Sequence, residues 1–227
     1  MIYAAIVTAG GIGSRMGKNI PKQFLKLGGI PILALTLKVF ENHPEIDFIV
    51  LTTPERYIDY CKSQIIQRYG FQKVRHVIQG SVTRQGSVLN GLKMAEDSDF
   101  VLIHDGVRPL IEASVISMCI EAVKVHGAAI SASPINDTVK RGAKFIAETI
   151  SRENLWLAHT PQAFRRSLIL HAHEKALADN FVGTDDASLV ERLGVSVAIV
   201  QDSNYNIKIT SPEDLLIAEQ LSAIRFP

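Results

Sequence analysis

Short runs of aliphatic and β-branched residues alternate along the chain with segments of helical periodicity, and this alternation limits the fold more than any other feature. We expect strands at residues 2–8, 48–52, 74–78, 100–104, 128–133 and 195–200. We expect helices at residues 31–43, 54–69, 83–95, 112–126, 165–178 and 212–224. Several strand runs are apolar without alternation, as in parallel strands buried on both faces. The sequence therefore predicts an α/β fold with a doubly wound, mostly parallel, Rossmann-like sheet.

Length and composition limit the classes of protein to which the chain can belong. The 227 residues suit a single domain over 1–227, and the net charge of +1 provides no general attraction for nucleic acid or an anionic membrane. Cys61 and Cys119 both lie in helical patterns, so neither a disulfide scaffold nor a zinc site is expected. No apolar run approaches the roughly 20 residues that span a bilayer. We expect a cytoplasmic protein without nucleic-acid or membrane partners.

One stretch interrupts the alternation of strands and helices. Residues 137–151, DTVKRGAKFIAETIS, contain two strand-like runs around Arg141 and Gly142, which predicts a projecting β-hairpin arm. The arm has little apolar surface of its own, so it must pack on something else. Either a second subunit or its own domain would serve, and the residues alone do not separate the two.

A glycine-rich loop, TAGGIGSRMG, follows the first expected strand at residues 8–17. Glycines allow a backbone to turn tightly and to bring its N–H groups close to a ligand. The dinucleotide fingerprint requires glycine where Met16 stands, and the P-loop requires glycine at Ile12 and Ser or Thr at Asn19. The loop therefore belongs to neither of these two common phosphate-binding types.

Two cations flank this loop, because Arg15 lies within it and Lys22 follows in the segment Pro21-Lys22-Gln23. A triphosphate requires both charge neutralisation and close backbone approach, and the loop offers both. The alternative is that Arg15 and Lys22 are solvated surface charges, as most lysines and arginines are.

The glycine loop and PKQ are joined by further motifs along nearly the whole chain. They are TRQGSV at 83–88, HDGVRP at 104–109, DT at 137–138, RENLW at 152–156, TPQ at 160–162, TDDAS at 184–188 and NIKIT at 206–210. In this order and spacing the chain resembles the sugar-alcohol-phosphate cytidylyltransferases, and most closely the branch that uses 2-C-methyl-D-erythritol 4-phosphate. The resemblance implies transfer of CMP from CTP to that acceptor, with release of pyrophosphate, in isoprenoid precursor synthesis.

The resemblance also implies roles for individual residues. Catalysis would depend on Arg15, Lys22 and Lys208, which would hold the triphosphate and stabilise charge at its α-phosphate. CTP would be bound by Ala9, Gly10, Gly11, Gly13 and Ser14, with Gly80 and Ser87 reading the cytosine edge. The acceptor would contact Asp105, Arg108, Thr138, Arg152, Thr160 and Thr184. The family further implies a homodimer in which the arm crosses over, so that Thr138 and Arg152 serve the neighbouring subunit's site.

Asp105 is the candidate metal ligand, because it follows the carboxyl end of an expected buried strand and carboxylates suit Mg²⁺. A turn or helix cap is the alternative role for this residue. His104 beside it is interpreted as a packed strand residue, since no second His or Cys stands at ligand spacing.

Three positions depart from the family pattern, and three other functions compete. Ser81 stands where a second glycine is usual, and Gly86 and Tyr205 stand where acids are usual. These changes concern the backbone contacts to cytosine and the support around the site. The competing functions are cytidylyl transfer to ribitol 5-phosphate, nucleotidyl transfer from UTP or GTP to a sugar 1-phosphate, and non-catalytic nucleotide binding.

Overall fold

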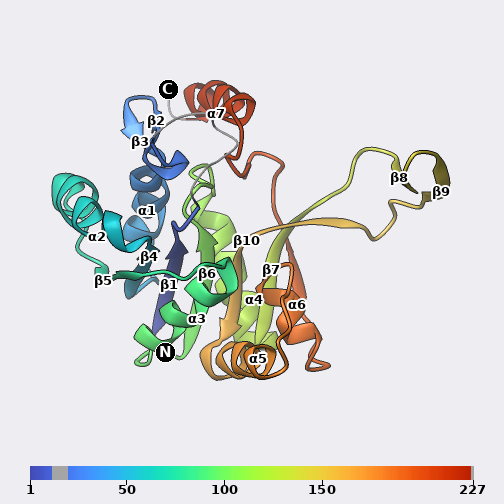
Figure 1. Cartoon of the computed structure of the whole chain (residues 1–227), viewed down its shortest axis with the longest axis horizontal. Helices are drawn as coiled ribbons and strands as arrows, with labels where there is room; N and C mark the ends of the chain where they lie inside the picture. Colours follow the sequence, from blue (N-terminus) through green and yellow to red (C-terminus); the bar gives the residue numbers. More distant parts are fainter. Residues whose placement is uncertain (12–19, 226–227) are drawn as a thin grey trace.

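A seven-stranded sheet forms the centre of the computed structural model, which describes residues 1–11 and 20–225 (Figure 1). Its strands lie in the order β11-β7-β10-β6-β1-β4-β5. They are β1 (Tyr3–Thr8), β4 (Phe48–Thr53), β5 (Val74–Gln79), β6 (Phe100–Asp105), β7 (Ala128–Pro134), β10 (Trp156–Arg165) and β11 (Ala198–Gln201). All six expected strands are present, and the predicted α/β fold with a mostly parallel sheet is confirmed.

The strand β10 was not predicted, and it runs antiparallel to both of its neighbours, β6 on one side and β7 on the other. Its sequence contains Pro161 and polar residues at 159, 160 and 162, so it lacks the apolar run of its neighbours. The register with β7 shifts between Ala158 and Gln162. The polar side chains of this irregular part are buried, which is a first indication that they have a functional role.

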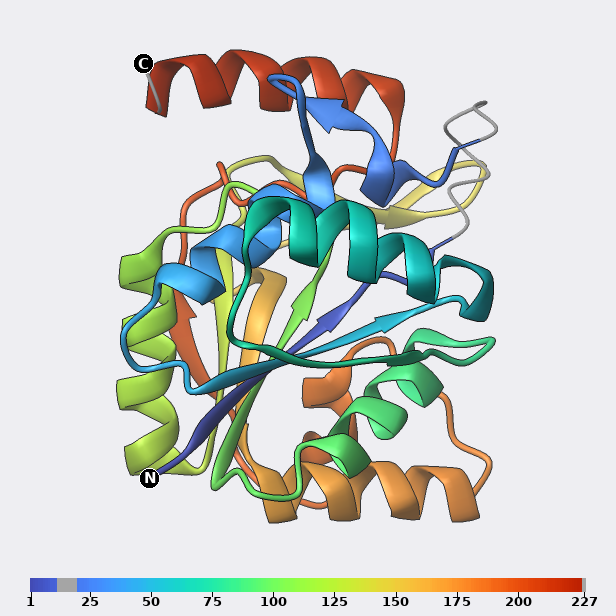
Figure 2. The same ribbon diagram turned by 90° about the vertical axis from the view of Figure 1, so that its left-hand side faces the viewer.

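Helices cover both faces of the sheet (Figure 2). They are α1 (Ile32–Asn42), α2 (Ile58–Tyr60), α3 (Arg84–Met94), α4 (Ala113–His126), α5 (Arg166–Ala178), α6 (Asp186–Glu191) and α7 (Pro212–Arg225). One buried cluster joins α1 and α4 to Tyr3, Ala5 and Val7 of β1. A second joins α3, α5 and α6 to Ala4 and Ile6, so both faces of β1 are buried as an unbroken apolar run requires.

Two expected details differ from the structure. The single helix expected at 54–69 is divided into a 3₁₀ turn at Glu55–Tyr57, the short α2, and a π-helical stretch at Cys61–Gln67. The short antiparallel pair β2 (Lys26–Leu27) and β3 (Ile30–Pro31) was not expected. Its turn needs glycine, because Gly28 and Gly29 have φ of +58° and +83°. This pair and α7 form a small third core that closes one end of the molecule.

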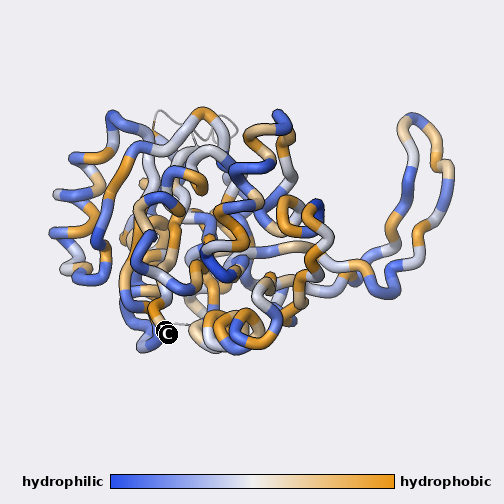
Figure 3. Tube along the Cα trace, turned by 90° about the horizontal axis from the view of Figure 1, so that it is seen from below, coloured by the Kyte–Doolittle hydropathy of each residue, from blue (hydrophilic) through white to orange (hydrophobic). Residues whose placement is uncertain are grey.

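An antiparallel hairpin of β8 (Val139–Gly142) and β9 (Ile146–Ile150) lies within residues 137–151 and projects far from the sheet (Figure 1). We call residues 137–151 the arm. Its turn lies beyond Gly142, later than the Arg141–Gly142 pair that the sequence indicated. Hydrophilic and hydrophobic residues are mixed along it (Figure 3), and Phe145 near its tip is 79% exposed. The arm therefore has no hydrophobic core within its own chain.

The carboxyl ends of β1, β4 and β6 meet at one edge of the sheet, because Thr8 pairs with Thr52 on one side and with Asp105 on the other. The glycine loop begins at this edge, although Gly13, Ser14 and Arg15 lie outside the described residues. Among residues 1–11 and 20–225 there is no helix of the length and apolarity needed to cross a membrane.

Candidate active site

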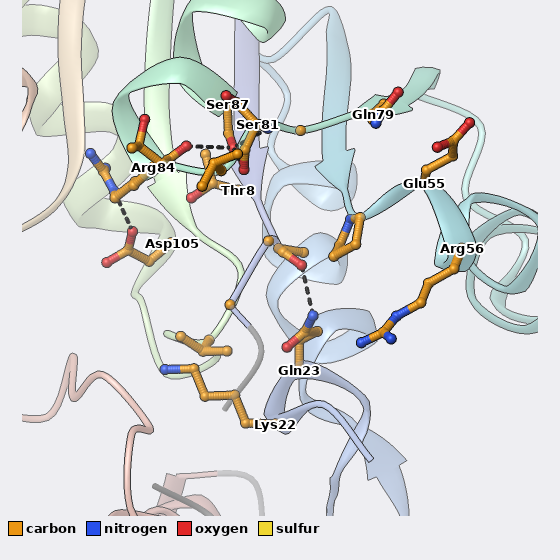
Figure 4. Close-up of a pocket in the computed structure, with 18 of the residues that line it drawn as sticks. Thr8, Lys22, Gln23, Glu55, Arg56, Gln79, Ser81, Arg84, Ser87 and Asp105 are labelled. Atoms are coloured by element: carbon orange, nitrogen blue, oxygen red, sulfur yellow. Dashed lines mark hydrogen bonds and ion pairs between the residues drawn. The ribbon is translucent and has the colours of Figure 1, made fainter. Parts of the chain in front are cut away.

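A cavity of about 940 Å³ opens at this edge of the sheet, where ligands bind in open α/β folds (Figure 4). Its walls include many of the residues that the sequence selected. They are Ala9, Gly10, Gly11, Lys22, Gly80, Ser87, Asp105 and Lys208. Segments from both ends of the chain therefore meet at one site.

On one wall the glycine loop is joined to Lys22. Gln23, which is 1% exposed, donates a hydrogen bond of 2.7 Å from Nε2 to the carbonyl oxygen of Ala9. Lys22 precedes it in a 3₁₀ turn, and a Cβ added to Gly11 would lie 3.4 Å from Lys22 Cε. Gln23 thus ties the turn that carries Lys22 to the glycine loop. The Lys22 side chain therefore lies beside glycine backbone, where no side chain obstructs an anion.

On the opposite wall, Ser87 in the first turn of α3 holds the loop before that helix. Its hydroxyl accepts a hydrogen bond of 2.8 Å from the Ser81 N–H and donates one of 2.9 Å to the Thr83 carbonyl. A Cβ at Gly80 would lie 2.9 Å from Ser87 Oγ, so only glycine fits there without a shift. The Ser87 proton is therefore engaged with the protein, and the side chain shapes the backbone that lines this wall.

Asp105 lies between three cations in a group that we call the Asp105 cluster, made of Asp105, Arg84, Arg108 and Lys208. Oδ1 of Asp105 lies 2.9 Å from Arg84 Nε, and Oδ2 lies 2.8 Å from Lys208 Nζ and 3.6 Å from Arg108 Nε. Burial raises the pKa of Asp105, but the three positive charges outweigh that effect and hold the pKa well below its usual range. The carboxylate therefore stays ionised although it is only 5% exposed.

His104 and Thr160 fix the backbone of Asp105 from behind. His104 is fully buried, with Nδ1 at 3.0 Å from Thr160 Oγ1 and Nε2 at 3.1 Å from the Arg108 carbonyl oxygen. Thr160 Oγ1 also accepts a hydrogen bond of 3.1 Å from the Asp105 N–H. Burial lowers the pKa of His104 to about 4, so the ring is neutral near pH 7. His104 is a packed strand residue, as the sequence indicated.

The segment that carries Lys208 is fastened to the centre of the sheet. Asn206 donates hydrogen bonds from Nδ2 to the Thr160 carbonyl at 2.8 Å and to Asp202 Oδ2 at 2.6 Å. Arg108 Nη1 donates to the Asn206 carbonyl at 2.6 Å. Lys208 itself stays 40% exposed at its side chain, so its ammonium is held at the cavity and open to a ligand.

The sequence matches the family described as 2-C-methyl-D-erythritol 4-phosphate cytidylyltransferase over residues 3–223. The chain belongs to this family. A relative of that name from Geotalea uraniireducens is 50% identical over 96% of each chain, and one from Geobacter metallireducens is 47% identical over the whole of both. A solved 4-diphosphocytidyl-2C-methyl-D-erythritol synthase from Anaerococcus prevotii is 34% identical, with a TM-score of 0.87 over 98% of this chain and 96% of that one. The chain is thus a cytidylyltransferase, an enzyme of the nucleotidyltransferase class.

A second hollow, of about 540 Å³, lies at the base of the arm and shares Lys208 with the first cavity. Arg108 lines it as well, whereas Asp105 lines the first cavity. Lys208 is thus the cation that the two hollows share, and Arg108 lines the second hollow beside it. The two hollows are therefore separate spaces that meet at Lys208.

The remaining acceptor candidates lie away from these spaces. Thr138 and Thr184 are exposed, and Arg152 is exposed beside the arm, where its Nη1 donates to the Asn136 carbonyl. None of the three lines either hollow within the part of the chain that the structure describes. Thr160 is buried, with its hydroxyl in two hydrogen bonds within the protein, and it lines neither hollow. The site of one chain therefore gathers only part of the set expected for this family.

Arg84 and Gln162 belong to motifs of the sequence, but the sequence indicated no role for either residue. Arg84 lines the cavity and contacts Asp105, and Gln162 of β10 accepts hydrogen bonds of 3.1 Å from the N–H groups of both Asp186 and Ala187 at the start of α6. Both lie within motifs of the family, TRQ and TPQ. Their partners are far away in sequence, so spacing within a motif could not reveal them.

The residues present fit a magnesium site only in part. Within residues 1–11 and 20–225 there is no group of three or more His, Cys, Asp or Glu side chains that could hold a metal ion. Asp105 offers one carboxylate, of which Oδ2 is the oxygen not bonded to Arg84. Mg²⁺ is commonly held by one or two carboxylates together with substrate phosphates and water. The donor set thus suits a metal that arrives with a triphosphate.

Proposed function

We propose that this chain transfers the cytidylyl group of CTP to 2-C-methyl-D-erythritol 4-phosphate, giving 4-diphosphocytidyl-2-C-methyl-D-erythritol and pyrophosphate in isoprenoid precursor synthesis. Membership of the family supports the substrates. The observation that carries the mechanism is Lys208, which lies between the two hollows and 2.8 Å from Asp105.

The reaction joins two anions, so charge stabilisation and positioning are the main tasks of the protein. An oxygen of the acceptor phosphate attacks the α-phosphorus of CTP, and the bond from that phosphorus to the bridging oxygen of pyrophosphate breaks. We assign the triphosphate to the backbone of Ala9, Gly10 and Gly11 with Lys22, and to Gly13, Ser14 and Arg15 of the same loop. Lys208 lies where it would neutralise the acceptor phosphate and the α-phosphate together.

Selection of cytosine is assigned to the loop before α3. The backbone at Gly80 and Ser81 lines the cavity, and Ser87 holds that backbone in place. Peptide N–H and C=O groups at fixed positions can match the donor and acceptor pattern of one base edge and leave unpaired groups against another. CTP would therefore be preferred to UTP, GTP and ATP.

Magnesium is assigned to Asp105 together with phosphate oxygens of CTP. When bound, the ion would neutralise charge on the triphosphate. Asp105 Oδ2, which lies 2.8 Å from Lys208 Nζ, would be the carboxylate oxygen that holds the ion, and the ammonium of Lys208 would serve phosphate.

The acceptor site is assigned to two subunits of a homodimer. Arg108, Thr160 and Thr184 would come from one chain, whereas Thr138 and Arg152 would come from the partner's arm region. The exposure of the arm supports this assignment, because an unsupported hairpin with apolar residues such as Phe145 is stable only when it packs on something. We place the enzyme in the cytoplasm, where CTP and the acceptor are available to it.

The test of this function is pyrophosphate release with CTP and Mg²⁺, with 2-C-methyl-D-erythritol 4-phosphate and ribitol 5-phosphate offered in parallel. We expect turnover with the first acceptor and at least about 100-fold lower kcat/KM with the second, since the two acceptors differ in a methyl group and in their hydroxyls. Replacement of CTP by UTP, GTP or ATP should lower the rate strongly. Equal use of ribitol 5-phosphate would contradict the acceptor assignment, and no release with either acceptor would contradict the function.

A further inference from the structure

A chain of ion pairs and hydrogen bonds runs away from the active site behind Asp105. Arg84 donates from Nε to Asp105 Oδ1 at 2.9 Å and from Nη1 to Asp186 Oδ2 at 2.7 Å. The other oxygen of Asp186, Oδ1, lies 3.1 Å from His173 Nε2. Asp186 and His173 are each 1% exposed, and neither lines the cavity. The roles assigned so far use Asp105 but none of the three residues behind it.

We propose that Arg84 is a positioning residue that fixes the rotation of the Asp105 carboxylate, and that the buried Asp186 acts through Arg84. The two oxygens of Asp105 are divided between different partners, since Arg84 holds Oδ1 while Lys208 and Arg108 face Oδ2. With Oδ1 held, Oδ2 is the oxygen presented to ligands in the site. The inference rests on the proposed function, because it concerns the reaction that Asp105 serves.

Asp186 is needed because one carboxylate does not fix a guanidinium. A single ion pair leaves the long Arg84 side chain several rotamers, whereas two carboxylates on two of its nitrogens leave essentially one orientation. Asp186 is itself fixed at the start of α6, where its N–H and that of Ala187 donate to Gln162 Oε1. The position of Arg84 is therefore set by β10 and α6, two elements remote from it in sequence.

The electrostatics of the chain agree with this arrangement. Burial raises the pKa of Asp186, but Arg84 and His173 outweigh the effect and lower it below its usual value. Two carboxylates then flank one guanidinium, and the positive charge of Arg84 is compensated from both sides. Charge balance alone would also suit a purely structural ion-pair network, so the experiment must separate positioning from stability.

A double-mutant cycle with Arg84→Lys and Asp186→Asn separates the two roles. Lysine keeps the charge but cannot bond two carboxylates with fixed geometry, and asparagine keeps the shape of Asp186 without its charge. We expect each single change to lower kcat at least about 10-fold, because small displacements of a reacting group are costly. We expect the double variant to be no slower than Arg84→Lys alone. Additive losses in kcat would overturn the proposal, because they would show that Asp186 acts independently of Arg84.

Two further measurements make the outcome specific. CTP affinity, measured by calorimetry with and without Mg²⁺ and in the absence of acceptor, should stay within about threefold of wild type in both single variants, since a positioning defect appears mainly in kcat. The matched control is Arg166→Lys, because Arg166 also contacts α3, through hydrogen bonds of 3.3 and 3.1 Å to the Leu92 carbonyl, and touches none of the charged chain. It should keep wild-type kcat.

Thermal unfolding distinguishes the remaining outcomes. If Asp186→Asn does not fold, the test rests on Arg84→Lys alone, because the Arg84 side chain is partly exposed. A folded Arg84→Lys with lowered kcat and unchanged CTP affinity supports the proposal, and a destabilised Arg84→Lys with wild-type kcat overturns it. Wild-type protein without activity towards CTP and the acceptor would instead refute the proposed function, so the two failures are distinguishable.

Discussion

The Asp105 cluster and the arm differ in how strongly the rest of the chain holds them. Asp105 is 5% exposed and contacts three cations, with its backbone fastened by Thr160 and His104 behind it. The arm is a two-stranded hairpin whose residues are almost all exposed, with Arg152 exposed directly after it. The Asp105 cluster is thus preorganised within one chain, whereas Thr138 and Arg152, which we propose bind the acceptor, are exposed in their own chain.

This difference predicts that substitutions in the two regions will separate stability from activity. Buried groups of the cluster should affect folding and catalysis together, because Asp105 ends β6 and its ion-pair partners are packed around it. Arm residues should affect only acceptor binding and assembly, because nothing in their own subunit packs on them.

The largest effect is expected for Lys208→Ala. Removing a preorganised charge at a reacting phosphate typically costs about 10²- to 10³-fold in kcat, and we expect a loss of this size. Steady-state pyrophosphate release measures it. Lys93→Ala, an exposed lysine of α3 outside both hollows, is the control and should keep wild-type activity. A loss in kcat of less than about threefold would show that Lys208 does not stabilise the transition state.

The next largest effect is the pH dependence of stability that arises from His104, which is buried behind the Asp105 cluster. The unfolded chain binds a proton at His104 near pH 6.5, whereas burial lowers the pKa of the folded ring to about 4. Stability should therefore fall as pH decreases from 6.5 to 4, by about 3 kcal/mol in total from this residue. Denaturant unfolding at pH 7 and pH 4.5 measures this, and His104→Gln should reduce the dependence.

The control for that measurement is His126→Gln, an exposed histidine at the end of α4. It should leave the pH dependence unchanged. His43 contributes in the same direction, because burial lowers its pKa too, so the dependence is reduced and not abolished in His104→Gln. An equal pH dependence in wild type and His104→Gln would show that His104 is not held neutral by its surroundings.

On the arm side, Arg152→Ala should raise KM for the acceptor about 10- to 100-fold, the range for losing a hydrogen-bonded charge. KM for CTP and the melting temperature should stay unchanged, because Arg152 is exposed in its own chain. Arg141→Ala is the matched control, since Arg141 lies on the arm and pairs with Glu148 there. A large fall in melting temperature in Arg152→Ala, with a normal KM for the acceptor, would show that Arg152 stabilises its own chain and would contradict its role in acceptor binding.

The smallest effect tests two departures from the family pattern. A Cβ at Gly86 would lie 2.6 Å from Ser81 Oγ and 2.7 Å from Ser81 Cβ, so the two positions compete for one space. Gly86→Ala should therefore destabilise the protein by about 1–3 kcal/mol through overpacking. Ser81→Gly in the same chain should restore most of that stability, as chemical denaturation would show. No recovery in the double variant would mean that the two departures are independent.

The sequence predicted the parts of the fold that depend on apolar periodicity. All six parallel-type strands were found because each is a short run rich in aliphatic or β-branched residues, although that of β5 is interrupted by Arg75 and His76. Strand β10 was missed because Thr160 and Gln162 are polar, and they are polar because they hold Asp105 and α6. Motif resemblance located the cavity residues from Ala9 to Lys208, but it could not find Arg84 as a bridge, since its partner Asp186 lies 102 positions away.

The measurement that most directly tests the account is subunit complementation between Lys208→Ala and Arg152→Ala. If each site combines Lys208 from one chain with Arg152 from its partner, a mixed dimer has one intact site and one doubly defective site. Random mixing makes half of the dimers mixed, so with the acceptor far below its wild-type KM, where both single variants are slow, activity should rise to about a quarter of the wild-type value. Activity that stays at the average of the two separate variants, under conditions in which mass analysis shows mixed dimers, would contradict a site shared between subunits.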